Sequence, residues 1–350
     1  MIVSPRERML QAITHQQVDH IPTQINFTHA MGEKLAAYFG LGLSELPARL
    51  GNHLRRLDLT YPKRASPDGG ASFDWWGVGW STATEGYWPA VSPLSDCTDL
   101  DKFYWPDPRA TGLLHGAAEV LAAEANAAAL ERHFIVPNLG FALFERAWSL
   151  RGFEKLMEDL ALRSDFVADL LDRITAIQEV LAQRFITLGV DGGYFGDDYG
   201  AQQSLLFSPR TWRALFKPRL ARLFAVFREA GLPVILHSDG DITEILPDLV
   251  EIGLTVLNPV QPEVLNLHWL KSTFAGQLAF YGGISTQTVL PHGTPAEVRS
   301  AARAALRVLA ADGTGLVLAP SHRMTTDIPI ENVAALLDVF EEMEGKAHAG

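Results

Sequence analysis

The sequence predicts an α/β protein folded as a single (β/α)8 TIM barrel, with a tryptophan-rich insertion after the second strand. Eight short apolar runs alternate with longer helical patterns along the 350 residues. From the third run onward, each run is almost continuously apolar until its last residues, which is the pattern of a strand buried on both faces of a parallel sheet. Barrels of this class reach this length as one domain, so we expect residues 1–350 to form a single domain.

The expected strands follow the apolar runs in chain order. The runs are rich in β-branched and aromatic residues, and the later ones end in polar or glycine-rich sequence. The first two runs show this pattern less clearly than the other six. The predicted strands are 21–27, 53–61, 134–140, 192–198, 233–239, 255–261, 278–284 and 315–321.

Three of the intervening helices have clear start or stop signals, with expected spans 164–189, 208–231 and 294–313. Ser164 and Ser208 are N-cap residues, and a proline follows Ser208 at the first helical position. Gly231 suits the left-handed position that ends a helix. Thr294 and Glu297 have the spacing of a capping box.

The segment 62–111 breaks this alternation and is the predicted insertion. It is rich in Trp, Gly, Pro and Ser, and includes Trp75, Trp76, Trp80, Trp88 and Trp105. We expect short antiparallel strands that fold over one end of the barrel. The tryptophans either attach this excursion to the barrel wall or form a hydrophobic lid above the substrate. Trp76 is the candidate substrate contact from this segment.

Composition excludes several kinds of partner. The chain has 29 basic and 41 acidic residues, a net charge of −12, which repels nucleic acid and anionic membrane surfaces. It contains no run of eighteen apolar residues, and its first residues lack the apolar core of a signal peptide. Cys97 is the single cysteine, which excludes an internal disulfide and a zinc site with two cysteines. These features predict a cytoplasmic protein.

Candidate site residues follow from a rule of this fold, in which the active site lies at the carboxyl ends of the strands. The fourth strand ends in Asp197 and Asp198, followed by Tyr199 and, a little later, Gln202. Adjacent side chains on a strand point in opposite directions, so one carboxylate reaches the mouth while the other caps a neighbouring loop. Alternatively, both aspartates only stabilise the turn.

The fifth strand ends in His237 and Asp239, which are two residues apart and therefore share a face. A histidine beside a carboxylate binds a metal or forms an acid/base pair. His322, after the eighth strand, is a candidate third ligand or second base. We expect His237, Asp239, His322 and Asp197 to be the catalytic residues, with the first three as the metal ligands if a metal is bound.

Three further residues complete the set of expected substrate contacts. Asn258 and Gln261 lie at the end of the sixth strand, and Gly283 lies near the end of the seventh. A glycine in a strand indicates a bulge or the close approach of a ligand. Together with Asp198, Tyr199, Gln202 and Trp76, these residues are the predicted substrate-binding set.

Several blocks of sequence resemble the uroporphyrinogen decarboxylase (URO-D) superfamily, which also contains cobalamin-linked methyltransferases. The similarity covers nearly the whole chain, and the order and spacing of the blocks are specific. The blocks are RERMLQAI at 6–13, VDHIP at 18–22, GDDYGAQ at 196–202, SPRTW at 208–212, HSDG at 237–240, YGGI at 281–284, APSH at 319–322 and DIPIEN at 327–332. The resemblance implies a (β/α)8 barrel with its site in the mouth.

The resemblance leaves two reactions open. The decarboxylases of the superfamily bind substrate carboxylates through an R-Q-A-G-R segment after the first strand, and the matching stretch 23–32 contains no arginine. The methyltransferases hold zinc through His-x-Cys and a second cysteine. Here Asp239 takes the place of the first cysteine, and Ser321-His322 lies near the position of the second. A site of His237, Asp239 and His322 is harder and richer in oxygen, so it suits zinc and other divalent ions.

We therefore expect a methyl-transferring enzyme that acts on a small substrate, with His237 and Asp239 binding a metal or activating the acceptor. The first alternative is a decarboxylase of a tetrapyrrole or a smaller acid, with Asp197 stabilising a cationic intermediate and with Arg55, Arg56 or Arg323 lining the mouth. The second is a non-catalytic cofactor-binding protein.

The expected cofactors are a divalent metal, zinc first, and a corrinoid methyl carrier, while a site without cofactor also stays open. The expected partners are the substrate, a corrinoid protein and a second copy in a homodimer.

Overall fold

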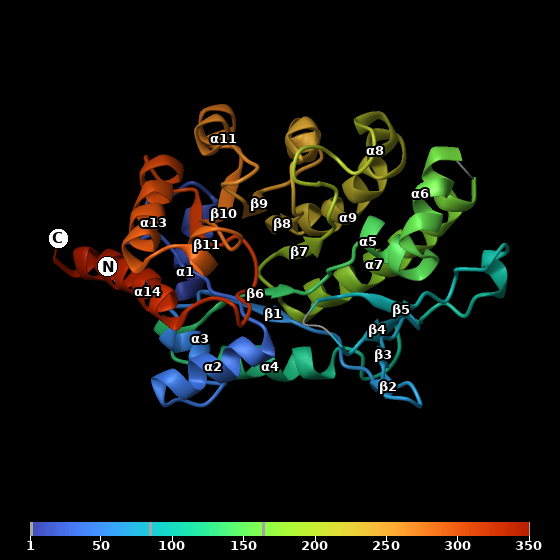
Figure 1. Cartoon of the computed structure of the whole chain (residues 1–350), viewed down its shortest axis with the longest axis horizontal. Coiled ribbons are helices and arrows are strands. Elements are labelled where there is room, and N and C mark those ends of the chain that lie inside the picture. Colours follow the sequence, from blue (N-terminus) through green and yellow to red (C-terminus); the bar gives the residue numbers. More distant parts are fainter. Residues whose placement is uncertain (1–2, 84–85, 163–164, 350) are drawn as a thin grey trace.

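The protein is an α/β structure with parallel strands, known here from a computed structural model that describes residues 3–83, 86–162 and 165–349. The parallel strands lie in the centre of the molecule, and helices flank them on the outside (Figure 1). Six of the eight expected strands are confirmed as β6 to β11, and the second as a short β1. The parallel strands are β1 (Leu54–Leu57), β6 (Phe134–Pro137), β7 (Gly193–Gly196), β8 (Val234–His237), β9 (Val256–Val260), β10 (Ala279–Ile284) and β11 (Leu316–Pro320).

These strands form two sheets that isolated bridges connect. One sheet has the order β11-β10-β9-β8-β7, and the other pairs β1 with β6; every pairing in them is parallel. A parallel bridge between Leu139 and Phe195 joins the end of β6 to β7, and Thr23 bridges both Asn52 and Leu318. The parallel pairings therefore run from β1 through β6 to β11 and return to β1 through the segment around Thr23.

The first expected strand, 21–27, is wrong as a continuous strand, and two side-chain amides explain why. Asn52 Oδ1 accepts a hydrogen bond from the backbone of Ile25 at 2.7 Å, and its Nδ2 donates to the carbonyl of the same residue at 2.9 Å. Gln24 Oε1 accepts from the backbone of His53 and Leu54. Side chains thus satisfy backbone groups that a ladder would otherwise pair.

A compact set of apolar side chains fills the space that the strands enclose, with α1 (Pro5–Ile13) contributing from one end. The strands supply alternate residues to this cluster, as period-two packing requires. From α1, Met9 is fully buried and Ile13 nearly so. The strand residues of this cluster include Leu54, Phe134, Val136, Tyr194, Ile235, Val256, Ala279, Tyr281, Val317 and Ala319.

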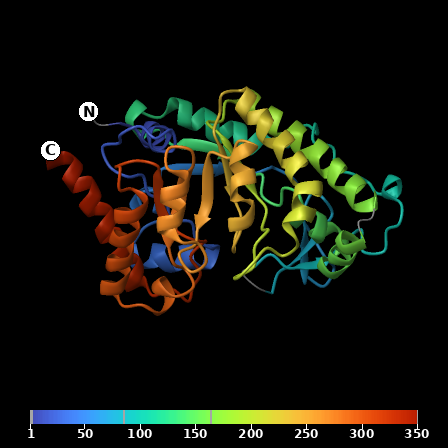
Figure 2. The same cartoon turned by 90° about the horizontal axis from the view of Figure 1, so that it is seen from above.

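The helices form the outer layer, as Figure 2 shows from above. The structure describes the following helices and 3-10 turns: α2 (His29–Phe39), α3 (Leu46–Arg49), η1 (Leu100–Lys102), α4 (His115–Asn126), η2 (Ala129–Glu131), α5 (Phe144–Arg151), α6 (Phe153–Leu162), α7 (Asp165–Leu188), α8 (Pro209–Leu215), α9 (Lys217–Glu229), η3 (Thr243–Ile245), α10 (Leu246–Glu251), α11 (Leu267–Phe274), α12 (Val289–His292), α13 (Pro295–Leu309) and α14 (Ile330–Ala349).

Two of the three expected helices are confirmed, and the third is divided. The helix expected over 164–189 is α7, although its predicted cap, Ser164, lies outside the described residues. Thr294 and Glu297 form the predicted capping box of α13. The single helix expected over 208–231 is instead α8 and α9, which meet at Phe216. Pro218 explains the break because it has no N–H to donate one turn back.

The segment after β1 forms the antiparallel strands that its composition predicts. Four short strands pair in the order β2-β3-β4-β5, and Figure 1 shows them to one side of β1. Their bounds are β2 (Arg64–Ala65), β3 (Ala71–Phe73), β4 (Gly79–Ser81) and β5 (Pro89–Val91). Among the described residues, no helix has the length and apolar character to cross a membrane.

Candidate metal centre and substrate pocket

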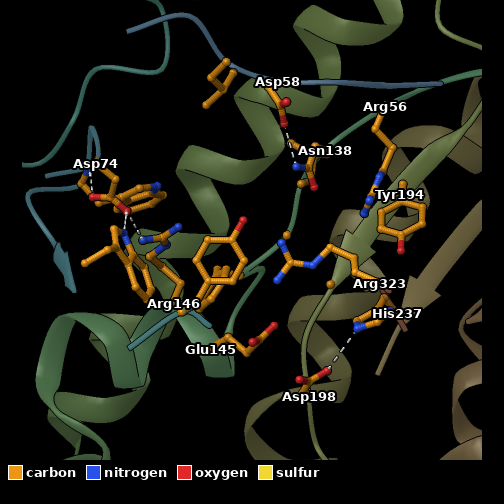
Figure 3. Close-up of a pocket in the computed structure, with 18 of the residues that line it drawn as sticks. Arg56, Asp58, Asp74, Asn138, Glu145, Arg146, Tyr194, Asp198, His237 and Arg323 are labelled. Atoms are coloured by element: carbon orange, nitrogen blue, oxygen red, sulfur yellow. Dashed lines mark hydrogen bonds and ion pairs between the residues drawn. The ribbon is translucent and has the colours of Figure 1, made fainter. Parts of the chain in front are cut away.

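A pocket of about 890 Å³ opens where the parallel strands end, and the antiparallel sheet forms its other wall. Its size is in the range that holds a small organic ligand. Arg56, Tyr194, His237 and Asn258 reach it from four different parallel strands, while Trp80 reaches it from β4. Figure 3 shows the side chains of Arg56, Tyr194 and His237 together on one side of this space. The pocket therefore lies where the rule for this fold class expects a site.

Asn258 determines which nitrogen of His237 carries a proton. Asn258 Nδ2 donates to the carbonyl of Tyr281 at 3.2 Å, so the amide oxygen faces the other way. That oxygen accepts from the Tyr194 hydroxyl at 2.8 Å and lies 2.8 Å from Nδ1 of His237. An amide oxygen can only accept, so the network assigns the proton of the neutral ring to Nδ1. Nε2 is left with its lone pair, the arrangement usual for a metal-binding histidine.

His237, Asp239 and His322 form a group that could hold a metal ion. One ligand atom from each lies within 4.8 Å of the other two. The Nε2 atoms of His237 and His322 each lie 3.8 Å from an oxygen of Asp239. Burial lowers the pKa of His322 and so favours the neutral ring that metals bind.

One atom of this group lacks a hydrogen-bond partner. Oδ1 of Asp239 is buried, and within the described residues no donor bonds to it. A buried carboxylate oxygen is unfavourable unless a donor or a cation compensates it. Two neutral imidazoles and one carboxylate are donors that a divalent ion such as zinc accepts. The residues present therefore fit a divalent metal.

The two adjacent aspartates face opposite sides, as the strand geometry predicts. Asp198 lines the pocket, with its Oδ1 3.8 Å from Nε2 of His237 and accepting from the backbone of Asp239 at 2.9 Å. Burial, and then the negative charge of Asp239, raise the pKa of Asp198 above its usual value. Asp198 is therefore the carboxylate that faces the candidate metal group.

Asp197 is fully buried and turned toward the start of α5. Its carboxylate accepts hydrogen bonds from the backbone of Leu143 at 3.2 Å, Phe144 at 2.9 Å and Glu145 at 2.8 Å. The hydroxyl of Tyr199 donates to the same carboxylate. Backbone groups at a helix N-terminus need such an acceptor. In this geometry Asp197 and Tyr199 hold α5 in place and do not contribute to the pocket lining.

The remaining predicted substrate residues divide between the pocket and the scaffold. Asn258 and Trp76 line the pocket, and Trp76 is 3% exposed. Gln261 is buried, and its side-chain oxygen accepts from the backbone of Gly240 at 2.6 Å. Gln202 is exposed. Gly283, with φ of +98°, faces α13, where an added Cβ would meet Ala305 at 3.3 Å.

Sequence reasoning missed several pocket residues, among them two in the first turn of α5. Glu145, in the first turn of α5, lines the pocket. Burial and the nearby charges of Asp198 and Asp197 raise its pKa well above the usual value, which favours the protonated form. Arg146 is also buried and forms an ion pair with Asp74 at 2.8 Å. No local signal marks either residue, because both reach the pocket only through the position of α5.

The arginines named in the decarboxylase alternative lie in two places. Arg56 and Arg323 line the pocket, and Figure 3 shows both side chains extending into it. Arg55 instead forms an ion pair with Glu124 at 2.9 Å outside the pocket. Cys97 is a free, half-buried thiol that does not line the pocket either. A thiolate ligand to the candidate metal group is therefore not available from this chain.

Comparisons with known proteins found solved structures that are similar to this chain. A solved methyltransferase from Methanosarcina mazei has 21% sequence identity, covers 98% of this chain and 99% of its own, and gives a TM-score of 0.71. A B12-independent methionine synthase from Shewanella sp. W3-18-1, solved with selenomethionine, has 14% identity, covers 67% of this chain and 68% of its own, and gives a TM-score of 0.46. No curated protein sequence matches the chain.

The first of these likenesses shows a shared fold over the full length of both chains. The sequence match is more specific, because the model of the uroporphyrinogen decarboxylase (URO-D) family matches residues 83–343. This range includes β6 to β11, the candidate metal group and most of the pocket lining. The chain belongs to the uroporphyrinogen decarboxylase family.

Proposed function

We propose that this protein is a methyl (one-carbon) transferase whose small substrate binds in the pocket beside a divalent metal held by His237, Asp239 and His322. The observation that carries the proposal is the geometry of these three residues: their ligand atoms lie within 4.8 Å of one another, and Asn258 leaves Nε2 of His237 free to bind. The likeness to a methyltransferase fold supports the same reaction class. A corrinoid protein as methyl carrier and a homodimer are part of this proposal.

The proposal includes the architecture. We take the chain as one (β/α)8 barrel domain in which 62–111 is an insertion that covers the mouth. The parallel bridges at Thr23 and Leu139 support a closed barrel, and the contribution of Trp76 and Trp80 to the pocket supports a covering role for the insertion.

The residues have separate roles in this proposal. A bound divalent ion would supply a Lewis acid that lowers the pKa of an acceptor hydroxyl or thiol. Asp198, close to Nε2 of His237, orients the acceptor and receives its proton. Glu145, whose raised pKa favours the protonated form, donates a hydrogen bond to the substrate from the first turn of α5. Trp76 packs against the apolar part of the substrate.

Elemental analysis and metal titration test the metal proposal directly. The wild type should bind one zinc or other divalent ion per chain, and His237→Ala, Asp239→Ala and His322→Ala should each weaken binding at least about tenfold. Cys97→Ser is the matched control, because the thiol lies outside the group, and it should bind like the wild type. Equal affinity in all five proteins would refute the site.

A methyl-transfer assay tests the reaction. Methylcobalamin is offered as donor, with thiol and phenolic acceptors, and demethylation is followed by absorbance. We expect activity that requires His237 and the added metal. If a folded, metal-loaded protein does not demethylate methylcobalamin with any acceptor, the methyltransferase proposal is refuted.

Decarboxylation is the second candidate, because Arg56 and Arg323 line the pocket and fixed cations bind carboxylates. Release of carbon dioxide from uroporphyrinogen and from smaller acids tests this candidate. His237→Gln separates catalysis from simple binding: an enzyme loses turnover and keeps its ligand, whereas a binding protein loses affinity in proportion to function.

A further inference from the structure

Two guanidinium groups in the pocket form no ion pair within the part of the chain that the structure describes. Arg56 and Arg323 both line it, yet neither forms an ion pair with any carboxylate of the described residues. Other arginines nearby do: Arg146 pairs with Asp74 at 2.8 Å, and Arg55 pairs with Glu124 at 2.9 Å. Within the described residues, the two cations that face the pocket therefore have no carboxylate at ion-pair distance, while Arg146 and Arg55 do.

Aromatic rings hold these two cations in place. The guanidinium carbon of Arg56 lies 5.1 Å from the centre of the Tyr194 ring, and that of Arg323 lies 4.9 Å from the centre of the Tyr87 ring. Cation–π contacts fix the position of a guanidinium without using its N–H donors. Arg56 also hydrogen-bonds to the Tyr194 side chain, but a guanidinium has five N–H donors. Both groups are therefore positioned, and still have donors available toward the pocket.

The pocket acids Asp58 and Asp74 have other hydrogen-bond or ion-pair partners, although the negative charge of Asp58 still acts on Arg56 from a distance. Asp58 accepts a hydrogen bond from Nδ2 of Asn138 at 2.7 Å and forms no ion pair with Arg56 among the described residues. Asp74 is taken by Arg146. A cation that is partly removed from water without a counter-charge is unfavourable. An anionic ligand between Arg56 and Arg323 would remove that cost.

The adjoining wall is a cluster of three rings in mutual edge-to-face contact. Ring centroids of Trp80 and Phe141 are 4.9 Å apart, and Tyr87 lies 5.7 Å from each of them. All three line the pocket, and Tyr87 also carries the Arg323 guanidinium. Such a surface favours a flat ring over an aliphatic chain, because aromatic pairs contribute more than their buried area alone.

We propose that Arg56 and Arg323 form a subsite for the carboxylate of an aromatic carboxylic acid, whose ring lies against Trp80, Tyr87 and Phe141. Planar guanidiniums bind a carboxylate through paired hydrogen bonds. His237 and His322 line the same pocket, so a substrate held here lies in a space that the candidate metal group borders. The inference rests on the proposed function in one respect, because it takes this pocket as the substrate site. It holds for both methyl transfer and decarboxylation.

Calorimetric titration with benzoate tests the subsite. The full-length protein is first treated with a chelator, so that a carboxylate cannot bind through a metal. Benzamide has the same shape without the charge, and should bind at least about tenfold more weakly, the loss expected for one charge-assisted hydrogen bond. Cyclohexanecarboxylate, which keeps the charge and lacks the flat ring, should bind several-fold more weakly than benzoate.

Variants locate the binding groups. Arg56→Gln and Arg323→Gln should each lower benzoate affinity at least about tenfold. Arg55→Gln is the matched control: it removes the same charge from the neighbouring strand position, and should bind benzoate like the wild type. Circular dichroism confirms that each variant is folded, and the comparison of benzoate with benzamide on the wild type stands without any variant.

The outcomes separate this inference from the metal proposal. Equal binding of benzoate and benzamide, or an equal loss in Arg55→Gln, would overturn the carboxylate subsite even if the protein binds metal at His237. Equal binding of cyclohexanecarboxylate would overturn its aromatic half. A protein that discriminates benzoate as expected but binds no metal keeps the subsite and loses the metal centre.

Discussion

The proton on His237 gives a sharp test of the candidate metal centre. In Asn258→Leu the side chain keeps a similar size but loses the oxygen that lies 2.8 Å from Nδ1 of His237. The ring is then free to carry its proton on Nε2, the nitrogen that faces Asp239, and a protonated nitrogen cannot bind a metal. Loss of such a partner typically weakens metal binding 10–100-fold, or about 1.4–2.7 kcal/mol.

Asn258→Asp is the matched variant because it keeps an acceptor for Nδ1. It loses only the donor to the Tyr281 carbonyl, which lies 3.2 Å from Nδ2 in the wild type. Its zinc affinity should stay within about threefold of the wild type or become tighter, since a carboxylate partner makes the imidazole a more basic ligand. The Leu variant should therefore lower the zinc affinity, whereas the Asp variant should leave it nearly unchanged or raise it.

The assay is competition for zinc with a chromophoric chelator at neutral pH, with circular dichroism to show that each variant is folded. The result that refutes the reasoning is a folded Leu variant that binds zinc as tightly as the wild type. An Asp variant that loses as much affinity as the Leu variant would also contradict it, because the acceptor for Nδ1 would then be irrelevant.

Three further predictions concern the scaffold, and urea unfolding measures each. Asp197→Ala leaves three backbone N–H groups at the start of α5 without an acceptor, so at mildly acidic pH it should lower the free energy of unfolding by at least about 2 kcal/mol; no loss would contradict the capping role. Burial raises the pKa of Asp197 to about 7, compared with about 3.9 in the unfolded chain. The folded state therefore favours the neutral carboxyl. The stability that this neutral form contributes is fully present below about pH 4 and is lost as pH rises through about 7. The wild type should therefore lose stability over this range relative to Asp197→Ala, and parallel pH profiles would refute the shift. Gly283→Ala should cost about 1–3 kcal/mol, because φ is +98° and the new Cβ meets Ala305, whereas the exposed Gln202→Ala should change stability by less than about 0.5 kcal/mol.

The later strands could be predicted because their burial is written into the sequence. Strands such as β6 and β11 are buried at every position, so each appears as an uninterrupted apolar run. The 21–27 segment could not be predicted correctly, since its pairing depends on the side chains of Asn52 and Gln24. Pairing of a backbone group with a distant side chain leaves no periodic pattern in the sequence.

The candidate metal residues were also partly predictable. His237 and Asp239 share a face because they are two apart on a strand, and the rule about strand ends placed His322 near them. For Asp197 and Asp198 the pleat predicts opposite directions, but not which one faces the pocket. Glu145 had no signal, because its position depends on the capping of α5 by Asp197.

The replacement of cysteine by aspartate has a chemical consequence beyond the change of ligand. In the thiolate-bound zinc sites that the family resemblance implies, two negative sulfurs offset both charges of the ion. Here two neutral imidazoles and the single carboxylate of Asp239 would offset only one. A divalent ion in this group would keep more positive charge and polarise a bound oxygen more strongly. Hard oxygen donors are also the partners that a harder site prefers. The ligand set and the free guanidiniums of Arg56 and Arg323 thus favour the same substrates: small oxygen-bearing anions, with a hydroxyl or ether oxygen as the reacting group in place of a thiol.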